Sequence, residues 1–192
     1  MYTYAQYLGY SEMKINNLNK NVLDEKGKML FDYSKLNLVR SFRIQKTYKL
    51  KPEIVDLFNK IDEKQIWLVI TEDWCGDSAQ NLPYIYKYVE NLNNIDFRIV
   101  LRDDNLNFVD NYFNHTGARS IPRILGFNSL GNELFRWGPR PKVANNLVKQ
   151  LKSEGKEKTL INEKLHLWYG RNKGRELENE LAAILNSLIR NN

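Results

Sequence analysis

The chain has 192 residues and a net charge of +6, and it is 42% hydrophobic and 27% charged. This composition is typical of a globular protein with a hydrophobic core. No apolar run reaches the roughly 18–20 residues that a membrane span needs, and the N-terminus lacks the basic-then-apolar pattern of a signal peptide. The single cysteine excludes an internal disulfide framework, so we expect a cytoplasmic protein.

The excess of basic residues raises the question of nucleic-acid binding. Lysine and arginine are spread along the chain, with local density at 40–51, 136–149 and 152–158. None of these segments interleaves aromatic residues at the spacing that nucleic-acid-binding modules use. We therefore expect a solvated basic surface and neither nucleic acid nor membrane as a partner.

The first third of the chain carries helical patterns. Residues 1–20 and 31–47 are weakly amphipathic, and a further helix is expected after Pro52, a favoured early-helix residue. The apolar residues at helical spacing in that third segment are Ile54, Leu57, Phe58 and Ile61.

The middle of the chain alternates strand and helix patterns. A continuous apolar run at 66–70 predicts a strand covered on both faces, and a helical stripe follows over 82–92. The next strand is expected at 97–101, before a short helix at about 105–114.

Two further strands are expected at 122–127 and 133–137, joined by the turn residues 129–132 as a hairpin. A helix over 143–151 completes the unit. The order βαβαββα predicts an α/β fold with a mixed four-stranded sheet and helices on both faces.

We expect residues 52–152 to form this domain, with helical extensions over 1–51 and 153–192. Residues 153–158 are typical of an exposed connector. An apolar stripe then predicts a helix, which we expect to pack on the same domain rather than on a partner. The stripe consists of Leu177, Leu181, Ile184, Leu185 and Leu188.

Cys75 is the only cysteine, and it lies where the strand at 66–70 gives way to a helix. A helix N-terminus offers unpaired N–H groups and the positive end of a dipole, which both favour a thiolate. The carboxylates of Glu72, Asp73 and Asp77 oppose ionisation, but water screens exposed charges. We expect an accessible, modestly acidic and reactive thiol rather than a buried structural cysteine.

Three separated elements together resemble the thioredoxin family. They are Trp74-Cys75-Gly76 before a helix, Pro83 within that helix, and Gly117-Ala118-Arg119-Ser120-Ile121-Pro122 at the start of the third strand. The resemblance covers about residues 52–152. The segments 72–78 and 136–141 are also similar to a bacterial subgroup with helical extensions at both ends.

The resemblance implies a thioredoxin-like fold and a role for each residue of the site. Cys75 is implied as the nucleophile, with Ser78 beside it. The Ile121–Pro122 bond is implied to be cis and to present the Ile121 backbone to an extended peptide, while Gly138 closes the same groove. The residues implied in substrate binding are Trp74, Gly76, Asp77, Ile121, Pro122 and Gly138.

The sequence departs from the family at two positions. The second cysteine of the family is Ser78 here, and a hydroxyl cannot attack a mixed disulfide. The buried carboxylate that the family keeps six residues before the nucleophile is Val69 here. Dithiol reductase turnover is therefore excluded, and any mixed disulfide needs an external thiol to resolve it.

Four functions remain open. We expect a role in thiol–disulfide redox homeostasis, with protein or low-molecular-weight thiols and disulfides as partners. The alternatives are a redox-inactive module that holds an extended peptide, iron–sulfur cluster handling, and peroxide sensing through Cys75. Iron–sulfur cluster handling is suggested by the similarity of residues 75–78 to the Cys-Gly-Phe-Ser of monothiol glutaredoxins. We expect no resident cofactor or metal, and the sequence leaves the oligomeric state open.

Other polar residues have competing interpretations. Adjacent Asp103 and Asp104 are expected to cap the following helix rather than to bind a metal, because neighbouring strand residues point to opposite sides. His115 is either an exposed loop residue or a partner of Cys75. Arg119 and Arg140 either are solvated or hold an acidic substrate.

Overall fold

The computed structural model describes residues 1–113 and 119–191. The chain forms two compact units, Met1–Pro139 and Arg140–Asn192. The first unit contains the whole β-sheet, and the second is helical.

The first unit begins with α1 (Tyr4–Asn17), a 3-10 turn η1 (Lys20–Val22) and α2 (Glu25–Thr47). The Thr3 hydroxyl accepts from the N–H of Gln6, and the Gln6 side chain accepts from the N–H of Thr3, so α1 starts at a capping box. α2 starts at Asp24, whose carboxylate accepts from the N–H of Gly27. Both predicted helices are present, and α2 begins earlier than its apolar pattern does.

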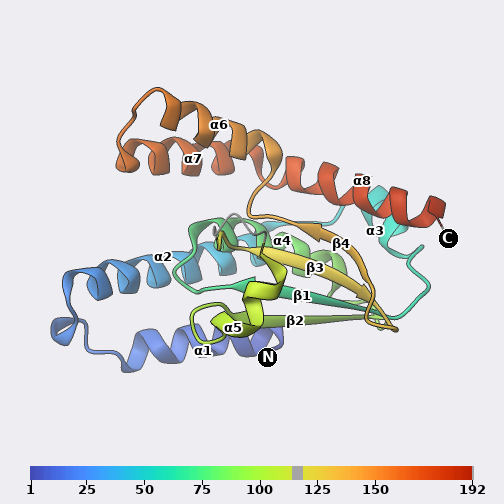
Figure 1. Ribbon diagram of the computed structural model, residues 1–192, viewed down its shortest axis with the longest axis horizontal. Helices are drawn as coiled ribbons and strands as arrows, with labels where there is room; N and C mark the ends of the chain where they lie inside the picture. Colours follow the sequence, from blue (N-terminus) through green and yellow to red (C-terminus); the bar gives the residue numbers. More distant parts are fainter. Residues whose placement is uncertain (114–118, 192) are drawn as a thin grey trace. The chain divides into compact units, whose positions relative to one another are not determined.

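The four strands form one mixed sheet in the order β2-β1-β3-β4 (Figure 1). β1 pairs parallel with β2 and antiparallel with β3, and β3 pairs antiparallel with β4. The predicted mixed four-stranded sheet is therefore confirmed. The strands are β1 (Gln65–Thr71), β2 (Ile95–Leu101), β3 (Arg123–Asn128) and β4 (Glu133–Trp137).

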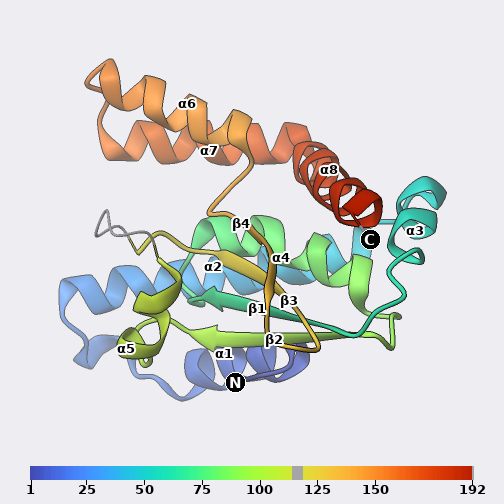
Figure 2. The same ribbon diagram turned by 45° about the vertical axis from the view of Figure 1, so that its right-hand side comes forward.

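Helices cover both faces of this sheet (Figure 2). On one face the Phe58 ring contacts Trp67 of β1 and Tyr88 of α4, with centroid distances of 5.9 and 5.1 Å. On the other face Val109 and Phe113 pack on side chains of β1, β2 and β3. The helices concerned are α3 (Pro52–Phe58), α4 (Gly76–Val89), α5 (Leu106–Val109) and the 3-10 turn η2 (Asp110–Tyr112).

The N-terminal helices are part of the first unit. Tyr2 and Ile99 exchange two backbone hydrogen bonds of 2.8 Å, which extends the sheet beyond the edge strand β2. Tyr4 is buried and stacks on Tyr86 of α4 with centroids 4.5 Å apart. Figure 1 shows α2 running alongside α4, with which it is in contact. The segment that supplies these contacts is therefore built into the core.

The second unit consists of α6 (Lys142–Ser153), α7 (Lys158–Asn172) and α8 (Arg175–Asn191). α6 and α7 share a small core of Ala144, Val148, Ile161, Leu165 and Tyr169. The domain boundaries drawn from the sequence place α6 with the sheet, whereas the compact units divide just before it. Packing of the C-terminal extension on the sheet domain stays a prediction.

Among the residues that the structure describes, no helix combines the length and the apolar character that crossing a bilayer requires.

Candidate functional site

The site is built where β1 ends and α4 begins. Cys75 is the N-cap residue of α4, with extended backbone angles. Its N–H donates to the carbonyl of Glu72 at 3.1 Å, and its own carbonyl accepts from the N–H of Ala79 at 3.2 Å. The sequence-based placement of Cys75 at a strand-to-helix junction is thereby confirmed.

The expectation of an accessible thiol is wrong. Cys75 is only 7% exposed and belongs to a hydrophobic cluster. The buried side chains around it come from three strands, from the short helix α5 and from the segment that follows η2. They are Leu68, Ile70, Val100, Val109, Phe113, Ile121 and Leu125. The thiol is therefore enclosed by apolar groups.

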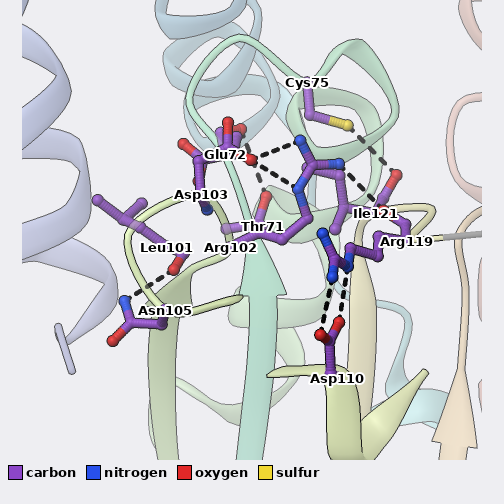
Figure 3. A network of polar contacts seen from close by, with 10 residues as sticks. All are labelled: Thr71, Glu72, Cys75, Leu101, Arg102, Asp103, Asn105, Asp110, Arg119 and Ile121. Carbon is purple, nitrogen blue, oxygen red and sulfur yellow. Dashed lines mark hydrogen bonds and ion pairs between the residues drawn. The ribbon is translucent and has the colours of Figure 1, made fainter. Parts of the chain in front are cut away.

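The sulfur contacts the loop that precedes β3. Cys75 Sγ donates a hydrogen bond to the carbonyl of Ile121 at 3.3 Å, and it points away from the carboxylates of Glu72 and Asp103 (Figure 3). The Ile121–Pro122 peptide bond is cis. The structure thus brings together Cys75, Ile121 and Pro122, which the sequence separates by more than forty positions.

Burial and, to a smaller extent, the Asp77 carboxylate raise the pKa of the Cys75 thiol to about 11. Hydrogen bonds from the Ser78 hydroxyl and from the N–H groups of Asp77 and Ser78 lower it by less. The prediction of a modestly acidic thiol is therefore wrong. A helix terminus contributes about 0.3–1 kcal/mol at an exposed site, whereas full burial can shift a pKa by about 3–5 units.

Hydroxyl groups occupy the interior behind Cys75. The Thr71 hydroxyl donates to Ser78 Oγ at 2.6 Å, and both residues are buried. Tyr7 of α1 is hydrogen-bonded with Thr71, and burial raises its pKa well above the ordinary value. Val69, at the position of the family's carboxylate, is fully buried. Sequence reasoning missed Thr71 and Tyr7, because no local motif links them to Cys75.

The rim of the site is formed by Trp74 and Arg102. The Arg102 guanidinium lies 5.0 Å from the centre of the half-buried Trp74 ring. It also donates to the Arg119 carbonyl at 3.0 Å and to the Asp103 carboxylate at 2.6 Å. Arg119 in turn forms a two-pronged ion pair with Asp110, at 2.6 and 2.7 Å (Figure 3). The proposal that Arg119 holds an acidic substrate loses support, since the Asp110 carboxylate already binds its guanidinium group.

Gly138, which follows β4, packs against the loop before β3 at Pro122. Its φ is +120°, and a Cβ there would overlap the Pro122 carbonyl oxygen. The following Gly138–Pro139 bond is also cis, which the sequence analysis did not anticipate. Gly76 is half-buried and Asp77 is buried in the first turn of α4, with the Asp77 carbonyl accepting from Asn81. Glycine is required at position 138, because the Pro122 carbonyl oxygen leaves no room for a Cβ there.

Two interpretations of other polar residues need correction or fall outside the structure. The N-cap of α5 is Asn105, without a side-chain cap, and the Asp103 carboxylate binds Arg102, so the expected capping by Asp103 and Asp104 is wrong. The candidate His115 lies outside the described residues, as do Gly117 and Ala118. Within the described part of the chain, His, Cys, Asp and Glu nowhere gather in a group of three suited to a metal ion.

Comparison with known proteins places this geometry in context. A protein-family model described as thioredoxin matches residues 25–152, a span that begins with α2. No curated protein matches the sequence.

Two solved structures have a similar fold. A protein of unknown function, PA1234 from Pseudomonas aeruginosa, is 14% identical with a TM-score of 0.50, and the match covers 99% of this chain and 96% of that one. An HIV 4E10 epitope scaffold is 17% identical with a TM-score of 0.52, covering 97% of this chain and 99% of that one. At such identities the likeness concerns the fold alone.

Proposed function

Because this chain belongs to the thioredoxin family and its only cysteine is buried, we propose that it is a thioredoxin-fold binding module without thiol–disulfide turnover. The observation that carries the proposal is the burial of Cys75, whose Sγ donates a hydrogen bond to Ile121 O at 3.3 Å. The sulfur thereby ties the first turn of α4 to the loop before β3. A reducing compartment such as the cytoplasm suits a lone thiol of this kind.

The raised pKa of Cys75 supports the loss of turnover. With a pKa of about 11, roughly one Cys75 in 10⁴ is ionised at pH 7, against about 3% of an ordinary thiol with a pKa near 8.5. The greater nucleophilicity of a more basic thiolate recovers about tenfold of this roughly 300-fold difference. Exchange at Cys75 is thus expected to be about thirtyfold slower than at a free cysteine, even before the restricted access to the buried sulfur is considered.

The surface beside the thiol supports an extended peptide as the bound partner. Trp74 and Gly76 are half-buried, Ser120 is exposed, and Gly138 presents bare backbone next to Pro122. We call Trp74, Gly76, Ser120 and Gly138 the peptide strip, in which three small residues offer main-chain groups beside one large aromatic ring. Main-chain hydrogen bonds with alternate side-chain contacts are the usual mode for such peptides.

Turnover is tested with a small disulfide. We expect wild type and Cys75→Ser to leave the rate of glutathione-dependent reduction of hydroxyethyl disulfide at its uncatalysed value at pH 7. Catalysis by wild type that disappears in Cys75→Ser would contradict the proposal.

Peptide binding is tested separately. Peptides selected from a random library on wild type are expected to shift the backbone amide signals of Trp74, Gly76, Ser120 and Gly138. Trp74→Ala should weaken this binding about tenfold or more, as removal of a buried aromatic anchor does. Binders that perturb only other surfaces, or that bind Trp74→Ala equally well, argue against the peptide strip.

Slow monothiol exchange is the second candidate, favoured by the position of Cys75 Sγ at a helix N-terminus beside the Ile121 carbonyl. In that reaction the Cys75 thiolate attacks a disulfide R–S–S–R′, so that Cys75–S–S–R forms and R′–S⁻ leaves. An external thiolate then attacks the mixed disulfide and releases Cys75, because Ser78 cannot do so. Cys75-dependent turnover in the disulfide assay establishes this function instead.

A further inference from the structure

A cavity of about 260 Å³ lies between the N-terminal helices and the loop before Cys75. It is lined by α1 and α2, by Leu18 and Leu23 on either side of η1, and by the loops that follow β1 and β2. Cys75 does not line it, and the thiol points toward Ile121 instead (Figure 3). The N-terminal helices supply an apolar wall of Ile15, Leu18, Leu23, Leu30 and Phe31, and the Trp74 ring lines the cavity from the loop after β1.

The opposite wall carries a buried carboxylate that is only half satisfied. Glu72 is 5% exposed, and its Oε1 accepts from the N–H of Asp103 at 2.6 Å. Within residues 1–113 and 119–191, no donor of the chain pairs with its Oε2, and this atom is not sealed from solvent. Because Glu72 lines the cavity, this oxygen is free to accept a charge-assisted hydrogen bond from a cation bound there.

The charges around the cavity leave it net negative. Lys14 is paired with Asp73, with 2.9 Å between Nζ and Oδ2, and Arg102 is paired with Asp103 at 2.6 Å. The two cations are therefore already neutralised. Glu72 and the exposed Asp104 remain as the carboxylates facing the cavity, beside the half-buried Tyr10 ring. Burial raises the pKa of Glu72 to about 7, as expected for an acid that lacks a positive partner.

We propose that this cavity binds a small organic cation, whose ammonium group donates to Glu72 Oε2 and whose apolar body packs on Ile15, Leu23 and Phe31. The apolar wall and the lack of a three-acid group among the described residues favour an organic ammonium over a metal ion. The volume is slightly below the roughly 300–1,000 Å³ of drug-sized sites, which suits an arylalkylamine. The inference goes beyond the proposed function, because it stands whether or not Cys75 exchanges.

The affinity of the cavity for an ammonium ion is expected to depend on pH. The ammonium binds the ionised form of Glu72, so its affinity rises as the pH rises from 6 to 8. An alkylammonium keeps its proton over this range, since amines of the lysine type have pKa values of about 10.4. The other groups facing Glu72 are Lys14, Asp73, Asp103 and Asp104, of which the first two form a salt bridge.

Calorimetric titration of the full chain with three probes that share a phenethyl body but differ in the charge of the terminal group tests the site. We expect phenethylamine to bind at least about tenfold tighter than 2-phenylethanol, as a charge-assisted hydrogen bond allows, and 3-phenylpropionate to bind weakest. Glu72→Gln should lose this tenfold preference. The control Asp96→Asn removes an exposed carboxylate that pairs with Arg98 and should leave it unchanged.

A second variant keeps the test independent of Glu72. Leu23→Trp adds bulk to the cavity and should weaken phenethylamine binding about tenfold while the thermal unfolding of the protein stays cooperative. Equal affinity for amine and alcohol, no measurable binding of the amine, or full binding by Glu72→Gln overturns the proposal. Cys75→Ser should bind the amine as wild type does, which separates this result from that of the disulfide assay.

Discussion

Cys75 shows at the residue scale how burial can outweigh a helix N-terminus. The N-cap position and the Ser78 hydroxyl both favour a thiolate, yet the surrounding apolar side chains exclude the water that would solvate it. The buried Asp77 carboxylate acts in the same direction as burial. A thiol that is protonated and donates to Ile121 O is the result.

The raised pKa of Cys75 links protein stability to alkaline pH. The neutral thiol is favoured in the folded state, so its contribution is complete below the ordinary value of 9.0 and is lost as the pH rises through about 11. The loss amounts to about 3 kcal/mol for a shift of this size. Because the folded thiol is only half ionised at pH 11, we expect the unfolding free energy of wild type to fall by about 2 kcal/mol more than that of Cys75→Ser between pH 8 and 11, measured by urea titration. Unfolding free energies that change equally with pH in wild type and Cys75→Ser would mean that the thiol is solvated.

The raised pKa of Glu72 also makes the folded protein less stable as the pH rises. Its pKa is raised to about 7, so the neutral acid stabilises the fold below about pH 4.5 and this contribution is lost as the pH rises through 7. We expect the side-chain carboxyl carbon of Glu72 to titrate near pH 7 in NMR spectra of the free protein. Adding phenethylamine should lower that midpoint, and a midpoint near 4.5 in the free protein contradicts the buried, half-paired carboxylate.

At the scale of elements, the loop before β3 and the end of β4 are held together by close backbone contact. Gly138 has a φ of +120° and no room for a Cβ beside the Pro122 carbonyl. The Cys75 hydrogen bond joins α4 to the same loop. Three elements that are distant in sequence therefore fix one another at the site.

This contact predicts a difference between two glycines with positive φ. Gly138→Ala adds a backbone clash to an unfavourable φ and should lower the unfolding free energy by about 3 kcal/mol. Gly131→Ala, with a φ of +81° and open space around it, should lower it by only about 1 kcal/mol. Equal costs in chemical denaturation would show that the Gly138 contact is not tight.

The strands and α4 were predictable because their patterns are local. The run at 66–70 and the turn residues 129–132 specify a buried strand and a hairpin without any knowledge of the rest of the chain. α7 falls within the helical extension predicted over 153–192, but its bounds were not predicted, because the exposed Leu167 blurs its apolar stripe. Its stabilising contacts with α6 are tertiary.

The site was predictable in its connectivity but not in its environment. Family resemblance correctly suggested that Cys75 and Ile121 lie together. The enclosure of the sulfur depends on Val109 and Phe113, and the hydroxyl network behind it on Tyr7. These residues come from segments whose patterns say nothing about a cysteine, so burial and pKa could not be read from the motif.

At the scale of the whole molecule, the N-terminal helices make the sheet unit complete. Tyr2 pairs with Ile99 and so covers the edge of β2, where unpaired strand groups would otherwise be exposed. Asn37 of α2 donates to the Asp73 carbonyl in the loop before Cys75. The same helices form one wall of the proposed cation cavity. We infer that they serve both folding and binding.

A pair of substitutions in α1 tests this role. Tyr4 is 2% exposed and stacked on Tyr86, so Tyr4→Ala should lower the unfolding free energy by about 3–5 kcal/mol. Met13→Ala, on the exposed side of the same helix, should change it by less than about 0.5 kcal/mol. Thermal unfolding with an unchanged midpoint for Tyr4→Ala would show that α1 is dispensable.

The central claim is that the only thiol of this protein is buried and protonated. NMR of protein with labelled cysteine follows the Cβ of Cys75 as one signal, because there is no second cysteine. We predict that this signal reports ionisation near pH 11 in the folded protein. A transition below about 8.5, the value of a free cysteine, would contradict the account and restore Cys75 as a reactive nucleophile.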